Sequence, residues 1–243
     1  MRGFTTFVRF LVRSAWVACA VSVAAPCAAQ EGDVPTLPGR ADGRGPVFAP
    51  SAWVVANTPA QRKVDLKVYG FYIGDLDVPV AQFDVPIRTT KNLTITPSYM
   101  YYAVPPSGLN GLAPQPRGYT DSYKEQQFRV DGTYAVAVGK FEISARNMYV
   151  RRFRPAPAED MNRYRGRISV AHPMAIDGHI WKPFASYETF YERTGGWNRK
   201  RLWSGVTLPV NKQVFVQPSY LWERSDGTRD VHYVLLGLIV NTR

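Results

Sequence analysis

The sequence predicts an all-β protein, an antiparallel up-and-down transmembrane β-barrel of about ten strands, with twelve strands as the alternative. Three observations predict this fold. The chain opens with an export signal, and from Trp53 onward it consists of segments of roughly ten residues that alternate apolar with polar side chains. No apolar run after residue 30 continues without a charge or turn for the roughly 20 residues that a membrane-spanning helix needs.

The export signal covers residues 1–29. Three arginines precede Ser14–Ala25, which carries no charge and is mostly apolar, and small residues then lead to a cleavage position at Ala29–Gln30. The run is short for a membrane-spanning helix. A lipoprotein signal at Cys27 is the lesser alternative, because Ala24-Ala25-Pro26 is a poor lead-in to a lipidated cysteine. We therefore expect a cleaved secretory signal.

Cleavage has consequences for chemistry and charge. Cys19 and Cys27 leave with the signal, so neither disulfides nor thiol chemistry are expected in the exported chain. The loss of three arginines lowers the formal net charge from +11 to +8. The remaining basic residues are spread singly, and together with export this argues against a nucleic-acid partner. Three histidines and no cysteines are too few for a metal cluster, and we expect no cofactor.

Residues 30–50 are expected to form a flexible tail, because four prolines and four glycines lie there. The barrel is expected to occupy residues 51–243. The predicted strands are a short Ser51–Asn57 and then Lys63–Gly74, Val80–Arg88, Leu93–Val104, Tyr123–Val138, Lys140–Arg154, Asn162–Pro173, His179–Glu192, Trp197–Leu208, Val214–Arg224 and Arg229–Asn241.

The connections between these segments alternate in length. Short turns such as Gly139 and Met174–Gly178 alternate with longer connections, of which Pro105–Ser122 is the longest. Outer-membrane barrels have short periplasmic turns and longer external loops. Aromatic residues concentrate beside the longer connections, which is typical of an interfacial girdle.

The strand count is expected to be even in a bacterial barrel. Ten strands from Lys63 onward place both chain ends on the periplasmic side. Ser51–Asn57 would make eleven, so either it is not a full strand or it has a further partner.

Three arginines fall on one face of a single predicted strand: Arg163, Arg165 and Arg167. An arginine on the lipid face costs about 2–4 kcal/mol near the membrane midplane, so these side chains are expected to face the lumen. They lie about 6.6 Å apart along the strand. At an effective dielectric constant of about 20, each adjacent pair repels by about 2.5 kcal/mol, so acids or bound anions must offset the repulsion.

A larger set of charged residues is expected to face the lumen. The candidates are Arg129, Asp131, Glu142, Arg146, Arg163, Arg165, Arg167, Glu188, Glu192, Arg199, Arg201 and Glu223. One interpretation is a cross-strand ion-pair network that fills a narrow barrel. The other is that unpaired arginines line a small water-filled path or an anion site.

Catalytic residues are not expected. His172 and Ser169 are three residues apart and therefore lie on opposite faces of a strand, and His232 has no serine within three positions. His179 lies beside a turn, and the sequence has no Gly-x-Ser-x-Gly motif. Glu188 and Glu192 share a face, but neighbouring arginines explain them without glycoside chemistry.

The pattern resembles the outer-membrane barrel family known as domain of unknown function 2490. The resemblance rests on Trp53 at the opening, on Asn162–Arg167, on Lys182–Glu188 followed by Asn198–Arg201, and on the closing segment Gln217–Val240. It implies a Gram-negative outer-membrane barrel of this family and carries no functional residues.

We expect an outer-membrane barrel that is structural or a narrow, porin-like channel with a charged lumen. The alternative is a soluble periplasmic barrel that binds a ligand, and the third option is an outer-membrane lipid-modifying enzyme. The expected partners are outer-membrane lipid, the barrel-insertion machinery and a small anionic solute. Insertion signals commonly end on an aromatic residue, whereas this sequence ends Asn241-Thr242-Arg243.

Overall fold

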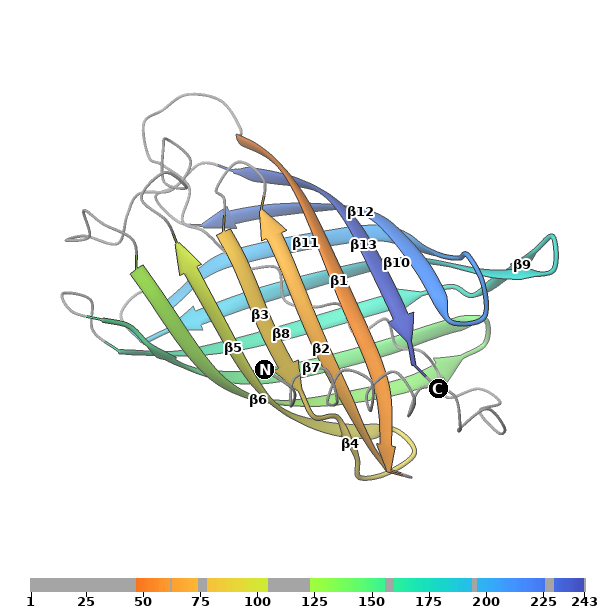
Figure 1. Cartoon of the computed structure of the whole chain (residues 1–243), viewed down its shortest axis with the longest axis horizontal. Coiled ribbons are helices and arrows are strands. Elements are labelled where there is room, and N and C mark those ends of the chain that lie inside the picture. Colours follow the sequence, from red (N-terminus) through yellow and green to blue (C-terminus); the bar gives the residue numbers. More distant parts are fainter. Residues whose placement is uncertain are drawn as a thin grey trace, which may run out of the picture.

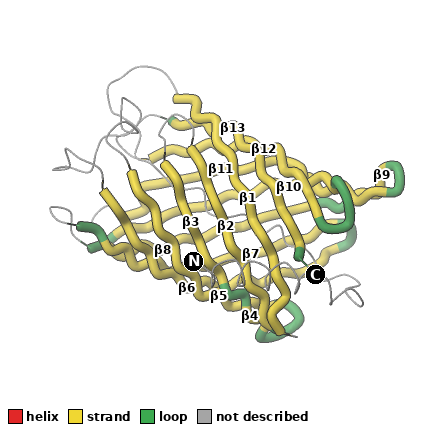
Figure 2. Tube along the Cα trace, viewed as in Figure 1, coloured by secondary structure: helices red, strands yellow, loops and turns green. Residues whose placement is uncertain are grey.

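The protein is a closed β-barrel of eleven strands with two additional short strands (Figures 1 and 2). The computed structural model describes residues 47–61, 63–73, 78–104, 123–155, 160–193, 196–225 and 230–242. The predicted signal peptide and most of the predicted tail lie outside these residues. Within them, no helix is long and apolar enough to cross a membrane.

The strands agree closely with the predicted segments. They are β1 (Val47–Gln61), β2 (Val64–Ile73), β3 (Val78–Asp84), β4 (Ile87–Arg88), β5 (Leu93–Val104), β6 (Tyr123–Val138), β7 (Phe141–Phe153), β8 (Met161–Ala171), β9 (Met174–Ile176), β10 (His179–Glu192), β11 (Gly196–Pro209), β12 (Val214–Ser225) and β13 (Val231–Asn241).

The barrel closes through a parallel seam. From β2 to β13 every pairing is antiparallel, but β1 lies between β2 and β13 and runs parallel to β13, with Val47 opposite Val231 and Asn57 opposite Asn241. This seam corrects the expectation of a purely antiparallel, even-numbered barrel. An odd number of strands closes only if one neighbouring pair is parallel.

β1 also corrects the expected role of the N-terminal segment. The predicted Ser51–Asn57 is part of a full strand that takes in the last four residues of the predicted tail. Val47 lies at the rim where β13 begins, and Asn241 lies at the opposite rim. The two ends of the barrel sequence therefore lie at opposite rims, not at the same one.

Two local features shape the short-turn rim. The predicted strand Val80–Arg88 bends at Pro86, which has no amide hydrogen to donate, so β3 ends at Asp84 and β4 continues along β5. The predicted turn at Met174–Gly178 is itself a hairpin, because β9 pairs with the start of β10. Asp177 and Gly178 both have positive φ, as a type I′ turn requires.

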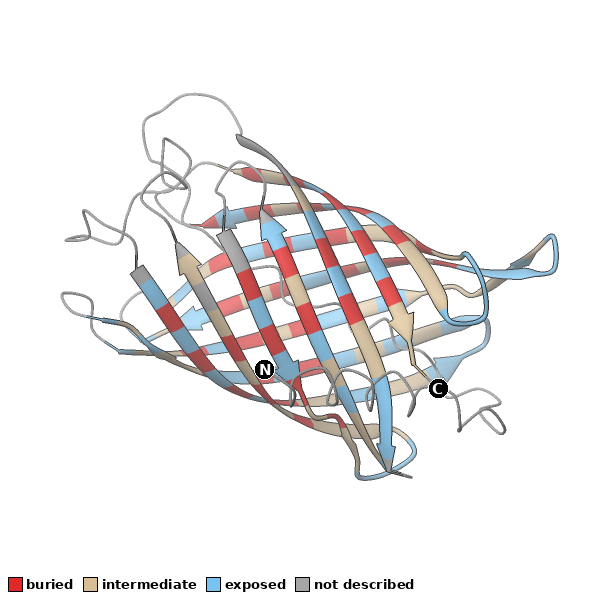
Figure 3. Ribbon diagram, viewed as in Figure 1, coloured by how far each residue is buried: buried red, intermediate tan, exposed pale blue. Residues whose placement is uncertain are grey.

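Alternation along each strand separates an apolar outer face from a mixed interior (Figure 3). In β6, Phe128 and Val130 are 54% and 52% exposed, whereas Gln127 and Arg129 between and beside them are buried. On the outside near the long-connection rim, Trp197 packs edge-on against Tyr164 and Tyr191. The outer wall is thus an apolar band with aromatic residues near one end.

The interior is divided between two walls. Side chains of β1, β2 and β13, together with Phe184, Trp203 and Leu221, form an apolar cluster. Buried arginines and glutamates of β7, β8, β10, β11 and β12 form the charged wall. This charged wall is the candidate functional site.

Candidate functional site: a luminal arginine cluster

Five neighbouring strands bring one set of charged side chains together in the lumen. We call it the arginine cluster, and its members are Arg146, Arg163, Arg165, Arg199, Arg201, Glu188, Glu192, Glu223 and Phe190. Cross-strand register positions it, because Glu188 lies opposite Arg167 on β8 and opposite Arg201 on β11, while Arg201 lies opposite Glu223 on β12. Each of these residues points inward because strand side chains alternate.

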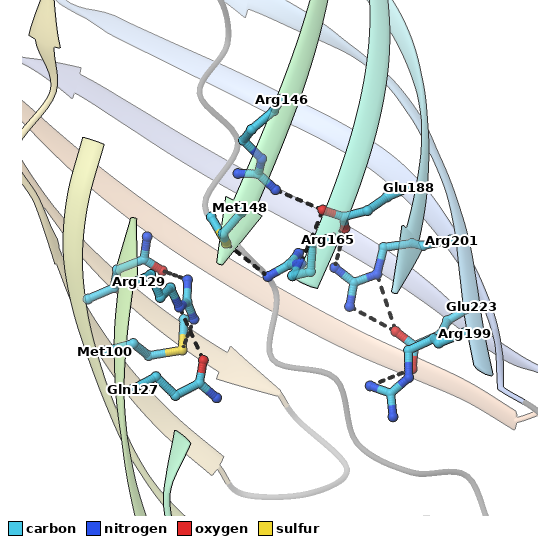
Figure 4. A network of polar contacts seen from close by, with 11 residues as sticks. Met100, Gln127, Arg129, Arg146, Met148, Arg165, Glu188, Arg199, Arg201 and Glu223 are labelled. Carbon is cyan, nitrogen blue, oxygen red and sulfur yellow. Dashed lines mark hydrogen bonds and ion pairs between the residues drawn. The ribbon is translucent and has the colours of Figure 1, made fainter. Parts of the chain in front are cut away.

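Glu188 is the hub of the cluster (Figure 4). Its carboxylate accepts hydrogen bonds from Arg146 Nη2 at 2.8 Å, Arg165 Nη2 at 2.8 Å and Arg201 Nη1 at 3.4 Å. Arg201 also donates through Nη2 to Glu223 at 2.8 Å. The hub is buried, so each charge depends on its neighbours rather than on water for stabilisation.

Phe190 supports four of the guanidinium groups. Its ring is fully buried, and the Cζ atoms of four arginines lie 4.7 to 5.7 Å from the ring centroid. The ring face is electronegative and attracts cations at such distances. The four arginines are Arg163, Arg165, Arg199 and Arg201.

Arg199 is the least satisfied member. Its Nε and Nη1 atoms are buried and have no hydrogen-bond partner in the part of the chain that the structure describes, and Glu223 Oε1 lies 3.9 Å from Nη1. By contrast, Arg163 donates through Nε to Glu192 at 2.7 Å. The five arginines and three glutamates of the cluster give it a formal charge of +2. The arrangement can therefore attract and hold an anion.

The other predicted lumen residues lie apart from the cluster or at its edge. Arg129 donates to Gln127 at 3.1 Å and to Gln82 at 3.2 Å and contacts Met100, and Asp131 accepts a hydrogen bond from Thr133. Arg167 is buried beside Glu188 on the neighbouring strand. Glu142 pairs with Lys182 of β10. Whether any of these residues acts in a function stays a prediction.

Four residues of the barrel interior, Phe190, Lys182, Arg152 and Glu125, were not predicted from the sequence. Phe190 and Lys182 lie on the inward face of β10. Both are an even number of residues from Glu188 and therefore share its face of the strand, and this spacing could have identified them. Arg152 donates through Nη2 to the buried Glu125 at 2.7 Å. No local pattern marks that pair, since its members are 27 positions apart in the sequence.

The histidines lie away from the cluster. His172 stacks on Phe141 beyond the end of β8, and His232 contacts Tyr220 on the outer face. His179 is exposed at the β9–β10 hairpin. Within the described residues, no group of three or more His, Cys, Asp or Glu side chains could hold a metal ion.

The closed barrel, the apolar outer band and the charged interior define the class of protein as a β-barrel of the kind that outer-membrane proteins form. The family model described as "Protein of unknown function (DUF2490)" matches residues 76–233, and the chain belongs to this family. The family thus agrees with the one inferred from the sequence. The search of curated proteins found no match.

Several solved outer-membrane barrels are similar in fold. LpxR from Salmonella typhimurium is 9% identical with a TM-score of 0.46, and the match covers 73% of this chain and 83% of LpxR. The beta domain of the Bordetella autotransporter BrkA is 15% identical with a TM-score of 0.41, covering 72% and 82%. A loop-deletion mutant of OmpT, an outer membrane protein of Vibrio cholerae, is 13% identical with a TM-score of 0.39, covering 72% and 57%.

Proposed function

We propose that this protein is an outer-membrane barrel whose narrow, arginine-rich lumen takes up and passes small anions. The single observation that carries the proposal is Arg199, a buried guanidinium inside the barrel with two donor atoms that no described residue accepts from. A buried donor without a partner costs about 1–3 kcal/mol, and more when it is charged. An anion that fills this position removes that cost.

The outer surface supports a membrane location. Exposed Phe, Tyr, Val, Leu and Ile side chains cover the outward positions of most strands. A soluble periplasmic barrel would expose this apolar band to water, where patches of more than a few hundred Å² are rare. The barrel strands are 7 to 16 residues long, and most exceed the roughly ten residues that cross a bilayer at a tilt.

The charges of the interior favour an anion-selective channel over an interior that ion pairs fill for a structural purpose only. Ion pairs occupy much of the charged wall, but the arginine cluster keeps its formal charge of +2. Rings of arginine or lysine select anions in pores. An eleven-stranded barrel is only slightly wider than the eight-stranded size that side chains fill completely, so the solute must be small.

We propose no catalytic role. The histidines lie at the rim, on the outer face and at a hairpin, away from the charged wall. A Ser–His mechanism needs the two side chains within hydrogen-bond reach. The absence of a catalytic role is tested by substituting alanine for each histidine and comparing the lipid profiles with that of the unchanged protein. A lipid profile that differs in a variant would favour a lipid-modifying enzyme.

The test is conductance in planar bilayers. The barrel is refolded, its folding is confirmed by a heat-dependent gel shift, and the reversal potential is measured in a salt gradient. We expect small, anion-selective steps. Arg199→Gln should reduce anion selectivity several-fold, because it removes the charge that the cluster leaves least paired.

Arg224→Gln is the matched control. Arg224 lies near the same rim but is 65% exposed, and its Nε is 3.9 Å from Asp230. The Arg224→Gln variant should leave the anion selectivity unchanged. Silence from a correctly folded barrel would contradict the channel and favour a structural role.

A further inference from the structure

A second group of polar side chains lies deeper in the lumen, on the apolar side of the arginine cluster. Four buried donor atoms there have no hydrogen-bond partner among the described residues: Trp53 Nε1, Trp203 Nε1, Gln217 Nε2 and Ser219 Oγ. Their side chains are 0 to 9% exposed. Most buried polar groups in proteins are hydrogen-bonded, so these four donors on β1, β11 and β12 require an explanation.

The barrel seam places Trp53 and Gln217 in one cross-strand row, with Gly237 of β13 between them. Gly237 of β13 lies opposite Trp53 on one side and opposite Gln217 on the other. A Cβ atom at Gly237 would come within 2.3 Å of Trp53 Cε2 and Cζ2 and 2.7 Å of Nε1. The N–H edge of the indole therefore lies directly over the glycine, in the same row as Gln217.

A second glycine lies against Ser219. Gly205 of β11 lies opposite Ser219, and a Cβ atom there would come within 2.5 Å of the serine Cβ and 2.6 Å of the Pro218 carbonyl oxygen, so this glycine lets β11 and β12 approach closely. Trp203 lies two residues before Gly205 on the same inward face. Ser219 is therefore the cross-strand neighbour of the residue two positions after Trp203.

The donor set determines the chemistry that it can recognise. An indole N–H only donates, and Gln217 Oε1 already accepts a hydrogen bond from Thr207 at 3.1 Å, so Nε2 is the unused part of that amide. Ser219 alone could also accept. A ligand for these four atoms must supply acceptors, and an oxyanion supplies the most acceptors in the smallest volume.

We propose that Trp53, Trp203, Gln217 and Ser219 form a luminal binding station for an oxyanion, a carboxylate or phosphate. This inference deepens the proposed function, on which it rests. Along β11 the station follows the arginine cluster, since Arg199 and Arg201 precede Trp203 toward the short-turn rim. The lumen then holds the arginine cluster and the neutral station in series. A conducting pore needs several such binding sites, each weak enough to release the ion.

The test reads the indoles directly. From Gln30 onward the chain has five tryptophans, so a refolded sample labelled with nitrogen-15 in tryptophan gives five indole N–H signals by NMR. Each is assigned by a Trp→Phe variant. Sodium phosphate or sodium acetate is then titrated, with sodium chloride keeping the ionic strength constant and glucose as a neutral control.

We expect the Trp53 and Trp203 signals to shift and saturate. The Trp222 signal is the internal control, because its Nε1 already donates to Asp230 at 3.0 Å, and it should not move. The double variant Gln217→Met and Ser219→Ala should weaken the apparent affinity about tenfold or more, since each neutral hydrogen bond contributes about 1 kcal/mol. Saturation by phosphate alone or acetate alone identifies the class of oxyanion.

Two results would overturn the station. One is the absence of a saturable shift of the luminal indoles with either anion in a barrel that passes the gel-shift test. The other is an equal response to glucose. Failure of the channel is seen separately, as a folded barrel that shows no anion-selective steps in bilayers while its Trp53 and Trp203 signals still shift and saturate.

Discussion

At the scale of single residues, the interior of this barrel depends on a few carboxylates. Glu188 accepts hydrogen bonds from three arginines that come from three different strands, β7, β8 and β11. Removing one partner of a buried ion pair is strongly destabilising because it leaves an uncompensated charge. Glu188 therefore contributes more to stability than its single charge suggests.

The first prediction concerns this hub. Glu188→Gln should lower the free energy of unfolding by about 3–5 kcal/mol, because Arg146, Arg165 and Arg201 lose their shared counter-charge. Urea-dependent loss of the heat-modifiable gel band measures the change. Asp160→Asn is the matched control, since its pair with Arg151 is more than one-third exposed on both sides and should change stability by less than about 1 kcal/mol. Equal effects of the two variants would show that the hub is not structural.

At the scale of elements, β1 determines how the barrel closes. It pairs with β2 over nearly its whole length and with β13 from Val47 to Asn57. The parallel seam places Trp53 over Gly237 and so creates the neutral donor station. Without β1, β2 and β13 would have to pair directly in an antiparallel, ten-stranded barrel.

The second prediction tests the seam. The exported chain is expected to be cysteine-free. The pair Val54→Cys and Leu238→Cys should therefore cross-link efficiently, either by oxidation or with a short bismaleimide. The reason is that these residues are directly opposite each other and both are exposed on the outside. The pair Val54→Cys and Val234→Cys is the control. Val234 is exposed on the same face but lies opposite Pro50, about 13 Å along the strand from the register position of Val54. Preferential cross-linking of the control pair would contradict the parallel register.

At the scale of the whole molecule, the barrel has two unlike rims. β5 ends and β6 begins at one rim, at Val104 and Tyr123, whereas the turns at Gly139–Lys140 and Asn211–Gln213 lie at the other. In outer-membrane barrels the longer loops face outward from the cell. The arginine cluster lies nearer the rim where β10 ends at Glu192, so in the orientation that we propose an anion entering from outside would meet it before the neutral station.

The third prediction follows from this orientation. A cysteine at exposed Arg193 should react with a membrane-impermeant maleimide in intact cells, and a cysteine at exposed Lys212 should react only after the outer membrane is permeabilised. The labelled fraction on a gel measures both. Labelling of Lys212→Cys alone in intact cells would mean the opposite orientation, and recovery of the protein in the soluble periplasm would contradict the membrane location.

Local alternation was enough to predict most strands. β5, β6 and β10 have the predicted bounds, and Arg163, Arg165 and Arg167 are buried together as expected. The pairing of Glu142 with Lys182 and the role of Phe190 were not predicted. They depend on contacts across intervening strands, which no local pattern encodes.

The sequence by itself determined the strands and their two faces, because the side-chain period of two is a property of neighbouring residues in a chain. Only the tertiary structure decided the odd strand number, the parallel seam and which donors lack partners. Closure depends on the pairing of strands about 180 residues apart, and a one-residue shift of register would exchange the two faces of a strand. For this reason the charged wall was predictable, whereas the oxyanion station beside the seam was not.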